Sequence, residues 1–212
     1  MSRPSYYRPA FDIFAPLYDF GIWLIGLLLG GERKLRNLAV ETISPAPGCK
    51  TLEICCGTAT ISLMSAEKGA SVYGLDISRG MLNVAREKAQ RQKVNLRLVQ
   101  SDVASMPFKE KAFDRAVASI GLHEMPFDVS RDIFKEIRRV LKENGKFVIF
   151  DYHKAEGFAG FLQKAFFIFA ERETAKEFIN ADLQKELRDA GFKNFNRRLL
   201  AQGVLQVIVV NA

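Results

Sequence analysis

The chain has 212 residues, a length that suits one domain of ordinary to large size with a substantial core. Its composition, 48% hydrophobic and 26% charged, is that of a globular protein and excludes an intrinsically disordered chain. The net charge of +7 at pH 7 favours anionic partners, although many soluble proteins carry such a charge without using it.

The N-terminal region predicts helices that precede the main domain. Residues 1–8 lack the apolar run and small-residue cleavage site of a signal peptide. The apolar stretch Phe20–Gly30 is too short to span a bilayer and suits a core helix, a lid over an apolar substrate or an interfacial membrane segment. Residues 32–43 have the spacing of an amphipathic helix. We therefore expect residues 1–44 to form a helical cap or substrate cover.

After the prolines of Ser44–Gly48, short apolar runs alternate with charged helical segments. The apolar runs predict strands at Lys50–Cys55, Ser71–Asp76, Val94–Gln100, Ala112–Ser119 and Gly145–Asp151. The segments between them predict helices at Ile61–Lys68, Gly80–Arg91 and Val129–Glu143, with Gly145 available for a left-handed turn after the last. This alternation predicts parallel strands joined by right-handed crossovers, hence a doubly wound α/β sheet.

The C-terminal segment follows a different pattern. A helix at Ala181–Gly191 precedes two apolar runs, Phe192–Leu199 and Val204–Val210, with no helix between them. Two successive strands predict an antiparallel hairpin, so we expect seven strands, mostly parallel, with a reversed last strand and helices on both faces. Within a domain over 45–212, we expect residues 155–180, including the short apolar stretch Phe158–Ala170, to form a lid-like insertion.

The three cysteines are Cys49, Cys55 and Cys56. An odd count with two adjacent residues does not resemble a disulfide framework. There is no CxxC spacing and no nearby histidine, so we expect no metal site. This usage predicts a reducing, cytoplasmic compartment.

Polar residues follow several of the predicted strands, where a doubly wound sheet binds its ligands. Glu53 stands near the end of the first strand, before the small-residue loop Cys55–Ala59. Asp76 ends the second strand and can accept hydrogen bonds from both ribose hydroxyls. Asp102 follows the third strand and can accept one from an adenine amine. Each aspartate alone suits a helix N-cap, but together they predict a nucleoside cofactor.

The charge of Glu53 discriminates between cofactors. A carboxylate there would repel the pyrophosphate of a dinucleotide but suits the ammonium group of a methionine moiety. Dinucleotide loops also usually carry a G-x-G-x-x-G pattern, whereas Cys55 and Ala59 stand where two glycines would be expected. If both residues keep ordinary backbone conformations, neither side chain blocks binding.

With these motifs the chain resembles the class I S-adenosylmethionine-dependent methyltransferases. Motif I of that family matches Leu52–Thr60, and Phe113–Ser119 resembles its motif IV. Further matches are the ribose-binding segment Val72–Leu82, the adenine-binding segment Gln100–Val103 and the post-core helix and strand Ile137–Phe147. The chain is most similar to the ubiquinone/menaquinone-biosynthesis and phospholipid N-methyltransferase subgroup, whose Tyr-Asp motif looks like Phe14–Asp19.

The resemblance implies that the chain binds S-adenosylmethionine and releases S-adenosylhomocysteine. Tyr18 would close over the cofactor, although it equally suits a packed aromatic residue at the domain edge. Met81 and Val103 would lie on either side of the adenine. The full implied cofactor-binding set is Tyr18, Glu53, Cys55, Cys56, Gly57, Thr58, Ala59, Asp76, Ile77, Met81, Ser101, Asp102, Val103 and Ser119.

Methyl transfer requires the acceptor in line with the methyl–sulfur bond, and a base is optional. For a phenol or hydroxyl acceptor a base helps. His123 follows the fourth strand and is the leading candidate, with Glu124 beside it. His153, after the fifth strand, is second. The alternative for His123 is a surface-loop residue or a cap on neighbouring backbone.

Three functions remain open. The first is methyl transfer to a small apolar or lipid-like acceptor, of the quinol-precursor, phospholipid-headgroup or phenol type. The apolar N-terminal segment would then suit peripheral membrane contact or a homodimer. The second is an RNA or protein methyltransferase using the basic surface. Against it, the sequence shows no RNA-binding module, and Ser119–Leu122 is no Asn-Pro-Pro-Tyr-like tetrapeptide. The third is a non-catalytic cofactor-binding protein, suggested by the altered glycine loop.

Overall fold

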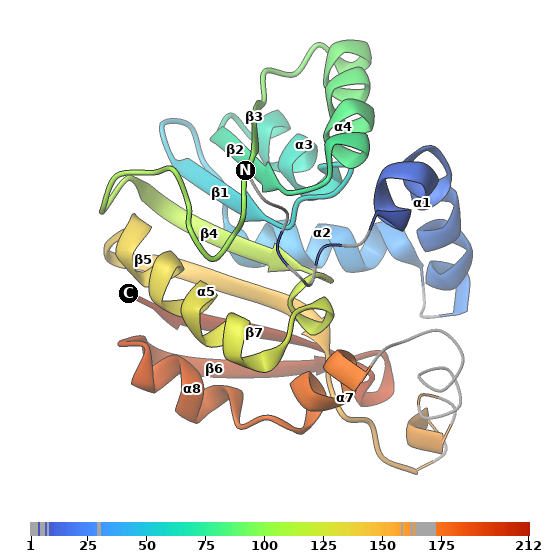
Figure 1. The fold of residues 1–212 in the computed structure, drawn as a ribbon, viewed down its shortest axis with the longest axis vertical. Helices are drawn as coiled ribbons and strands as arrows, with labels where there is room; N and C mark the ends of the chain where they lie inside the picture. Colours follow the sequence, from blue (N-terminus) through green and yellow to red (C-terminus); the bar gives the residue numbers. More distant parts are fainter. Residues whose placement is uncertain are drawn as a thin grey trace.

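A seven-stranded sheet forms the centre of the molecule (Figure 1). The structure is a computed structural model that describes residues 4, 7, 9–28, 31–157, 159–161, 163 and 173–212, with the side chains of 21–28 and 32 left out. The strand order is β3-β2-β1-β4-β5-β7-β6, and β7 runs antiparallel to both of its neighbours, β5 and β6. This confirms the doubly wound sheet with a reversed last strand. The strands are β1 (Lys50–Ile54), β2 (Ser71–Asp76), β3 (Arg97–Gln100), β4 (Phe113–Ser119), β5 (Leu141–Tyr152), β6 (Lys193–Leu200) and β7 (Leu205–Asn211).

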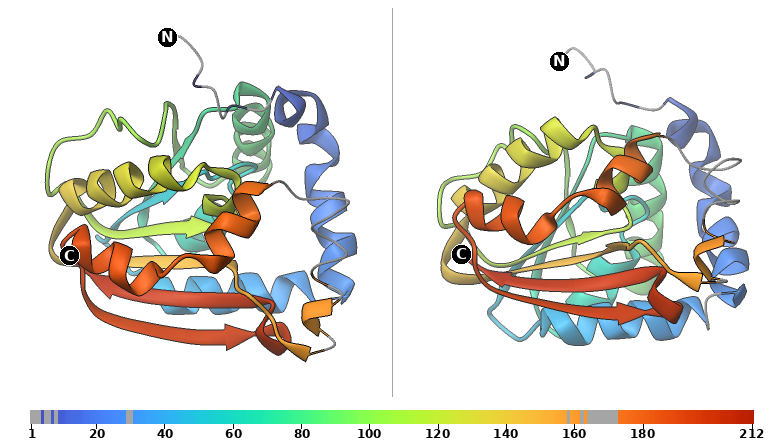
Figure 2. Two further views of the ribbon diagram at one scale, coloured as in Figure 1. Left: turned by 60° about the horizontal axis from the view of Figure 1, so that its bottom comes forward. Right: turned by 90° about the horizontal axis from the view of Figure 1, so that it is seen from below.

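Helices cover both faces of the sheet, as Figure 2 shows for α2 on one side and α5 and α8 on the other. The first face is covered by α5 (Phe127–Val140), α7 (Glu173–Asn180) and α8 (Leu183–Asp189). The second is covered by α2 (Glu32–Ile43) and α3 (Thr60–Glu67), with α4 (Arg79–Gln92) beside β2 and β3. Side chains alternate accordingly, because Phe147 and Ile149 of β5 pack on the first face while Val148 and Phe150 pack on the second.

Helix α1 (Ala10–Leu28) lies across the beginning of α4. The two backbones approach so closely that a Cβ atom on Gly80 would stand 2.5 Å from the carbonyl oxygen of Asp12. The Asp12 carboxylate also accepts hydrogen bonds from the Gly80 amide at 2.8 Å and from the Ser78 hydroxyl at 2.6 Å. Because free amides at a helix N-terminus attract a carboxylate, this contact fixes α1 over the carboxyl end of β2.

The junction between α5 and β5 differs from the prediction. A helix running to Glu143 is wrong, since α5 ends at Val140 and β5 already begins at Leu141. The left-handed residue is Asn144, with φ 60°, and not Gly145. The physical reason is that Leu141 is fully buried and pairs with Phe113 of β4, which draws the chain into the sheet early.

Two other boundaries move for a similar reason. The first strand ends at Ile54, because Cys55 adopts a left-handed conformation with φ 49°. The third strand begins at Arg97, because Lys93 turns left-handed after α4 and places residues 94–96 in a loop. The predicted helix Ala181–Gly191 is confirmed as α8, although its ends are shorter.

The two apolar stretches are only partly described. Phe20–Gly30 forms the second half of α1 up to Leu28, and its last two residues lie outside the described residues. Of Phe158–Ala170, only residues 159–161 and 163 lie within them. In the described part of the chain, no helix combines the length and apolar character needed to cross a membrane.

Candidate active site

The loop between β1 and α3 forms a tight left-handed turn. Cys55, Gly57 and Ala59 have φ values of 49°, 52° and 59°. The condition that Cys55 and Ala59 keep ordinary backbone conformations is therefore not met. A left-handed conformation costs an L-residue roughly 1–2 kcal/mol, so the loop retains a shape suited to glycine at two positions that lack it.

A glycine on the facing loop makes room for Cys55. A Cβ atom on Gly121, just after β4, would lie 2.7 Å from the Cβ of Cys55. Cys56 packs similarly, with its sulfur 3.0 Å from the position of a Cβ on Gly74. Burial, reinforced by the nearby Asp76 carboxylate, raises the pKa of both thiols well above the usual range. Both cysteines therefore act as small packing residues and not as nucleophiles.

Ala59→Gly is expected to leave the free energy of unfolding within about 0.5 kcal/mol of the parent. Relief of the left-handed strain offsets the lost methyl burial and the greater chain entropy of glycine. Ala85→Gly is the matched control, because Ala85 is equally buried in the same cluster but lies inside helix α4. The control should lose about 1–2 kcal/mol in urea unfolding. Equal losses in both variants would contradict the strain at Ala59.

Asp76 joins this loop to the start of α4. Its carboxylate accepts hydrogen bonds from the Gly57 amide at 2.7 Å and the Ser78 amide at 2.8 Å. Burial raises the pKa of Asp76, while these amides oppose the shift. No atom lies within 4 Å of the position of a Cβ on Gly57, so the loop leaves open space beside the carboxylate. A ribose would fit this arrangement of an acceptor next to a bare glycine backbone.

Glu53 lies beneath the same loop and is buried. Its Oε2 accepts hydrogen bonds from the Ser62 amide at 2.8 Å and the Ser62 hydroxyl at 2.5 Å. Both bonds fall on one oxygen, which leaves Oε1 as the acceptor for a ligand ammonium group. Burial raises the pKa of Glu53 to about 7 against the opposing effect of the Ser62 bonds. The carboxyl group is thus poised to ionise when a cation binds.

Helix α1 is attached through Asp19 to the loop Cys55–Ala59 between β1 and α3, called the cofactor loop below. This carboxylate accepts a hydrogen bond from the Thr58 hydroxyl at 2.7 Å and pairs with the Lys88 ammonium at 2.8 Å. Tyr18, the preceding residue, is half-buried. Burial raises the pKa of Tyr18 to about 12, with a smaller opposing effect from Arg36 and a reinforcing one from Asp76. The phenol expected to close over the cofactor is therefore close enough to Asp76, the carboxylate expected at the ribose, for the two groups to interact electrostatically.

The residues expected at the adenine lie at the neighbouring strand ends. The Ser101 amide donates to the Asp76 carbonyl at 3.1 Å, and the Asp102 carboxylate accepts the Ala104 amide at 2.9 Å. Met81 and Val103 are almost fully buried. Ile77 and Ser119 are half-buried, the first after β2 and the second at the end of β4.

The rim between β4 and β5 holds a buried charged cluster. His123 lies in the short 3-10 helix η1 (Leu122–Glu124), and only 2% of its surface is exposed. Its Nδ1 is 2.6 Å from the Asp151 carboxylate, and its Nε2 is 3.6 Å from that of Glu124. Burial alone would lower the pKa of His123, but the Asp151 and Glu124 carboxylates raise it to about 10. This upward shift of the pKa favours the protonated ring, which disfavours His123 as a base.

Sequence reasoning missed Asp151, although it ends the predicted fifth strand as Asp76 ends the second. An acidic residue at a parallel strand end was the available signal. Asp12 and Lys88 were missed because their contacts join segments far apart in the chain. His153, the second candidate base, contacts the Gly203 carbonyl at 3.0 Å in the turn η2 (Ala201–Gly203).

The electrostatics of the site oppose those of the whole chain. The carboxylates of Asp76, Asp151, Glu53 and Glu124 all act on the Cys55 thiol, in a protein with a net charge of +7. Such a cluster attracts a cationic sulfonium and repels a pyrophosphate. The residues present therefore fit S-adenosylmethionine, whose ammonium group Glu53 would bind and whose ribose Asp76 would bind.

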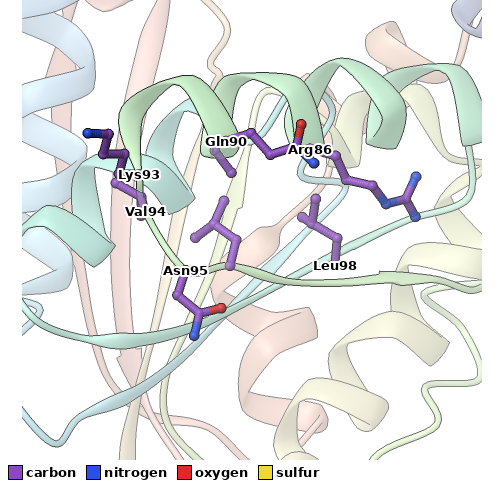
Figure 3. A pocket seen from close by; sticks show the side chains of 8 residues that line it. Arg86, Gln90, Lys93, Val94, Asn95 and Leu98 are labelled. Carbon is purple, nitrogen blue, oxygen red and sulfur yellow. The ribbon is translucent and has the colours of Figure 1, made fainter.

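A surface groove of about 340 Å³ lies elsewhere, between α4 and the chain leading into β3 (Figure 3). Its lining includes the exposed side chains Arg86, Gln90, Lys93 and Asn95. The groove adjoins the amino end of β3, whereas the site occupies the carboxyl ends of the strands. It contains none of the predicted site residues.

Comparisons with known proteins agree with this geometry. Residues 51–145 match the family model described as a methyltransferase domain. An uncharacterized methyltransferase of Synechocystis sp. is 36% identical over 193 residues, covering 89% of this chain and 88% of that protein. The demethylmenaquinone methyltransferase of Geobacillus sp. is 30% identical over 195 residues, covering 81% and 82%. The 2-phytyl-1,4-naphtoquinone methyltransferase of Trichormus variabilis is 35% identical over 153 residues, covering 69% and 65%.

A solved structure shares the fold. Phosphoethanolamine N-methyltransferase 2 of Haemonchus contortus, in complex with S-adenosyl-L-methionine, superimposes with a TM-score of 0.71. It is 18% identical, and the match covers 94% of this chain and 56% of that one. The strand order, the carboxylates around the loop between β1 and α3, and the extent of the match to the relatives lead to one conclusion. The chain belongs to the S-adenosylmethionine-dependent methyltransferases.

Proposed function

We propose that this methyltransferase acts on the reduced ring of a naphthoquinone that carries an apolar tail. Two relatives bear names that specify such quinones, one with a phytyl tail and one a demethylmenaquinone. The observation that carries the proposal is the double role of α1. One face of this helix binds the cofactor loop and α4, while the other exposes large apolar side chains. An apolar acceptor could therefore approach along the same element that covers the cofactor.

The chemistry requires the reduced form of the ring. A sulfonium methyl group is an electrophile, so its partner must be electron-rich, as a hydroquinone is and a quinone is not. A pair of ring π electrons forms the new carbon–carbon bond, and the pair of the broken carbon–sulfur bond stays on sulfur. The ring carbon then loses its proton to solvent. The products are the methylated hydroquinone, S-adenosylhomocysteine and one proton.

A labelled-methyl assay tests this proposal. The protein is incubated with methyl-labelled S-adenosylmethionine and 2-phytyl-1,4-naphthoquinone, either oxidised or reduced with dithionite. Label should enter the reduced ring and not the oxidised one. Parallel reactions with phosphoethanolamine and a simple phenol cover the other acceptor classes. Transfer to either of these at a higher rate would overturn the quinol assignment.

Helix α1 has the reverse of the usual amphipathic arrangement. Asp12, Ala15 and Asp19, at helical spacing, face the protein through polar bonds or burial. The outer face exposes Ile13 (72%), Phe14 (60%), Leu17 (65%) and Phe20 (64%). Figures 1 and 2 show residues 159–161 at the same edge of the molecule, where Phe161 is 67% exposed. We propose that this apolar stripe, Ile13, Phe14, Leu17 and Phe20, rests on a lipid surface from which the acceptor is drawn.

The double variant Phe14→Ser/Leu17→Ser is expected to reduce binding to phosphatidylglycerol vesicles about 10-fold or more, because two buried apolar side chains leave the lipid. Leu199→Ser is the control, since Leu199 is 49% exposed on the edge strand β6, away from the stripe, and its replacement should leave vesicle binding unchanged. Vesicle co-sedimentation gives the measurement. If the parent instead forms a dimer that the double variant dissociates, light scattering will show that a second copy covers the stripe.

A further inference from the structure

At the rim between β4 and β5, the side chains of Asp151, His123 and Glu124 form a series of contacts to which the methyl transfer described above assigns no role. Asp151 is fully buried at the end of β5. Its Oδ2 accepts amides of the loop after β4, from Gly121 at 3.3 Å, Leu122 at 3.0 Å and His123 at 3.4 Å. Its Oδ1 accepts the Tyr152 amide at 2.8 Å and contacts the His123 ring at 2.6 Å. This one carboxylate therefore fixes both the backbone and the ring of the catalytic rim.

The His123 ring is held on its other sides as well. The Tyr152 ring packs against it at a centroid distance of 4.6 Å and an interplanar angle of 64°. Its Nε2 points to the Glu124 carboxylate at 3.6 Å. Because a charged ring buried between two carboxylates cannot reorient without losing an ion pair, its position is well determined.

Glu124 is the outermost residue of this series. Its side chain is partly exposed, whereas those of His123 and Asp151 are not. The Glu124 carboxylate acts on both the Tyr18 phenol of α1 and the Cys55 thiol of the cofactor loop. Its carboxylate is therefore the member of the series that an acceptor can reach.

We propose that Asp151 is a positioning residue for methyl transfer. It holds the His123 ring, and His123 in turn orients the Glu124 carboxylate toward the hydroxyl group of the acceptor. Glu124 accepts the hydrogen bond of that hydroxyl, which places the ring and increases its electron density. The assignment rests on the proposed function only for the identity of the acceptor, because the order of the three groups is a property of the protein alone.

The first test is kinetic. Asp151→Asn keeps the size of the side chain and one acceptor oxygen, but removes the charge that holds the ring protonated. With reduced 2-phytyl-1,4-naphthoquinone, kcat should fall about 10- to 100-fold. The dissociation constant for S-adenosylhomocysteine should stay within about threefold of the parent. His123→Ala should behave alike, and the double variant should be no slower than the slower single variant, because the residues act as a unit.

Asp114→Asn is the matched control. This aspartate pairs with Lys142 at 2.6 Å on the surface, and its loss should change neither constant. An unchanged kcat for Asp151→Asn would overturn the proposal. So would a purely structural effect, in which kcat and cofactor affinity fall together in proportion to lost stability.

A second test needs no acceptor and therefore separates the two proposals. Nitrogen-15 NMR of the ring should show His123 protonated on both nitrogens at pH 7 in the parent and on one in Asp151→Asn. Addition of S-adenosylhomocysteine should move the Nε2 resonance in the parent, and Glu124→Gln should remove that response. If the quinol is not methylated but these signals behave as stated, only the acceptor is wrong. If Asp151→Asn leaves the ring doubly protonated, the positioning role is wrong.

Discussion

Glu53→Gln is expected to raise the free energy of unfolding at pH 8 by up to about 3 kcal/mol while weakening cofactor binding. Burial raises the pKa of Glu53 from 4.5 to about 7. Between these values the folded state holds a proton that the unfolded state has released, so stability falls as pH rises from about 4.5 to 7. Above pH 7 the full cost of burying the carboxylate is present, about 1.4 kcal/mol for each pKa unit. A neutral amide avoids it.

Urea unfolding of parent and variant at pH 5 and pH 8 measures the effect. The gain should be small at pH 5 and large at pH 8. Glu143→Gln serves as the control, because this surface carboxylate pairs with Lys111 in water, so its replacement should leave the free energy of unfolding nearly unchanged at both pH values. A gain in Glu53→Gln that is equal at both pH values would show that Glu53 does not titrate near neutrality.

The same ionisation governs cofactor binding. An ammonium group beside Glu53 favours the carboxylate, so binding near pH 6–7 should release a proton from Glu53. The affinity of the parent for S-adenosylhomocysteine should therefore rise as pH rises from 6 to about 7.5, and that of Glu53→Gln should not. Calorimetry in two buffers of different ionisation enthalpy counts the released protons.

Asp76→Asn is expected to weaken S-adenosylhomocysteine binding about 100-fold. The variant loses charge-assisted hydrogen bonds to the ribose, worth about 1.5–3 kcal/mol each. It also disturbs the loop, since the Gly57 and Ser78 amides bond different oxygens of the carboxylate, and the NH2 group that replaces one of these oxygens cannot accept. Both losses weaken the part of the site that is expected to hold the ribose.

Asp102→Asn is the isosteric comparison for this prediction. Its expected loss is about tenfold or less, because a single hydrogen bond to a neutral adenine amine is at stake. Calorimetric titration gives both constants, and unfolding measurements separate lost contacts from lost folding. Near-equal affinity of Asp76→Asn and the parent would remove Asp76 from the ribose site.

The strand pattern was readable from the sequence because buried parallel strands leave short apolar runs bounded by turns. Local sequence signals predicted the wrong element boundary where tertiary packing determines the structure. A Lys-Glu-Asn-Gly run suits a helix end, yet the fully buried Leu141 draws that segment into β5. The left-handed turn then falls on Asn144, the residue before the glycine.

The site could be predicted only as far as each residue belongs to a strand end. Glu53 lies near the end of β1 and Asp76 ends β2, and the structure places both beside the same loop. The contact between Cys55 and Gly121 could not be predicted from the sequence. The two residues lie in loops that follow β1 and β4, and these loops become neighbours only in the folded sheet. The raised pKa of His123 could not be predicted for the same reason, since it depends on Asp151 from a neighbouring strand.

The position of β7 has a consequence for how the protein is made. This strand comes last in chain order but lies between β5 and β6, and its side chains are largely buried. During synthesis the cofactor cradle between β1 and β4 can assemble early, while β6 must wait for β7 before it gains any sheet partner. The slowest step of folding should thus be the docking of the β6–β7 hairpin on β5, because the pairing of β7 with β5 joins segments far apart in the chain and is of high contact order. Until then the open edge of β5 is the part of the nascent chain most exposed to pairing with another molecule.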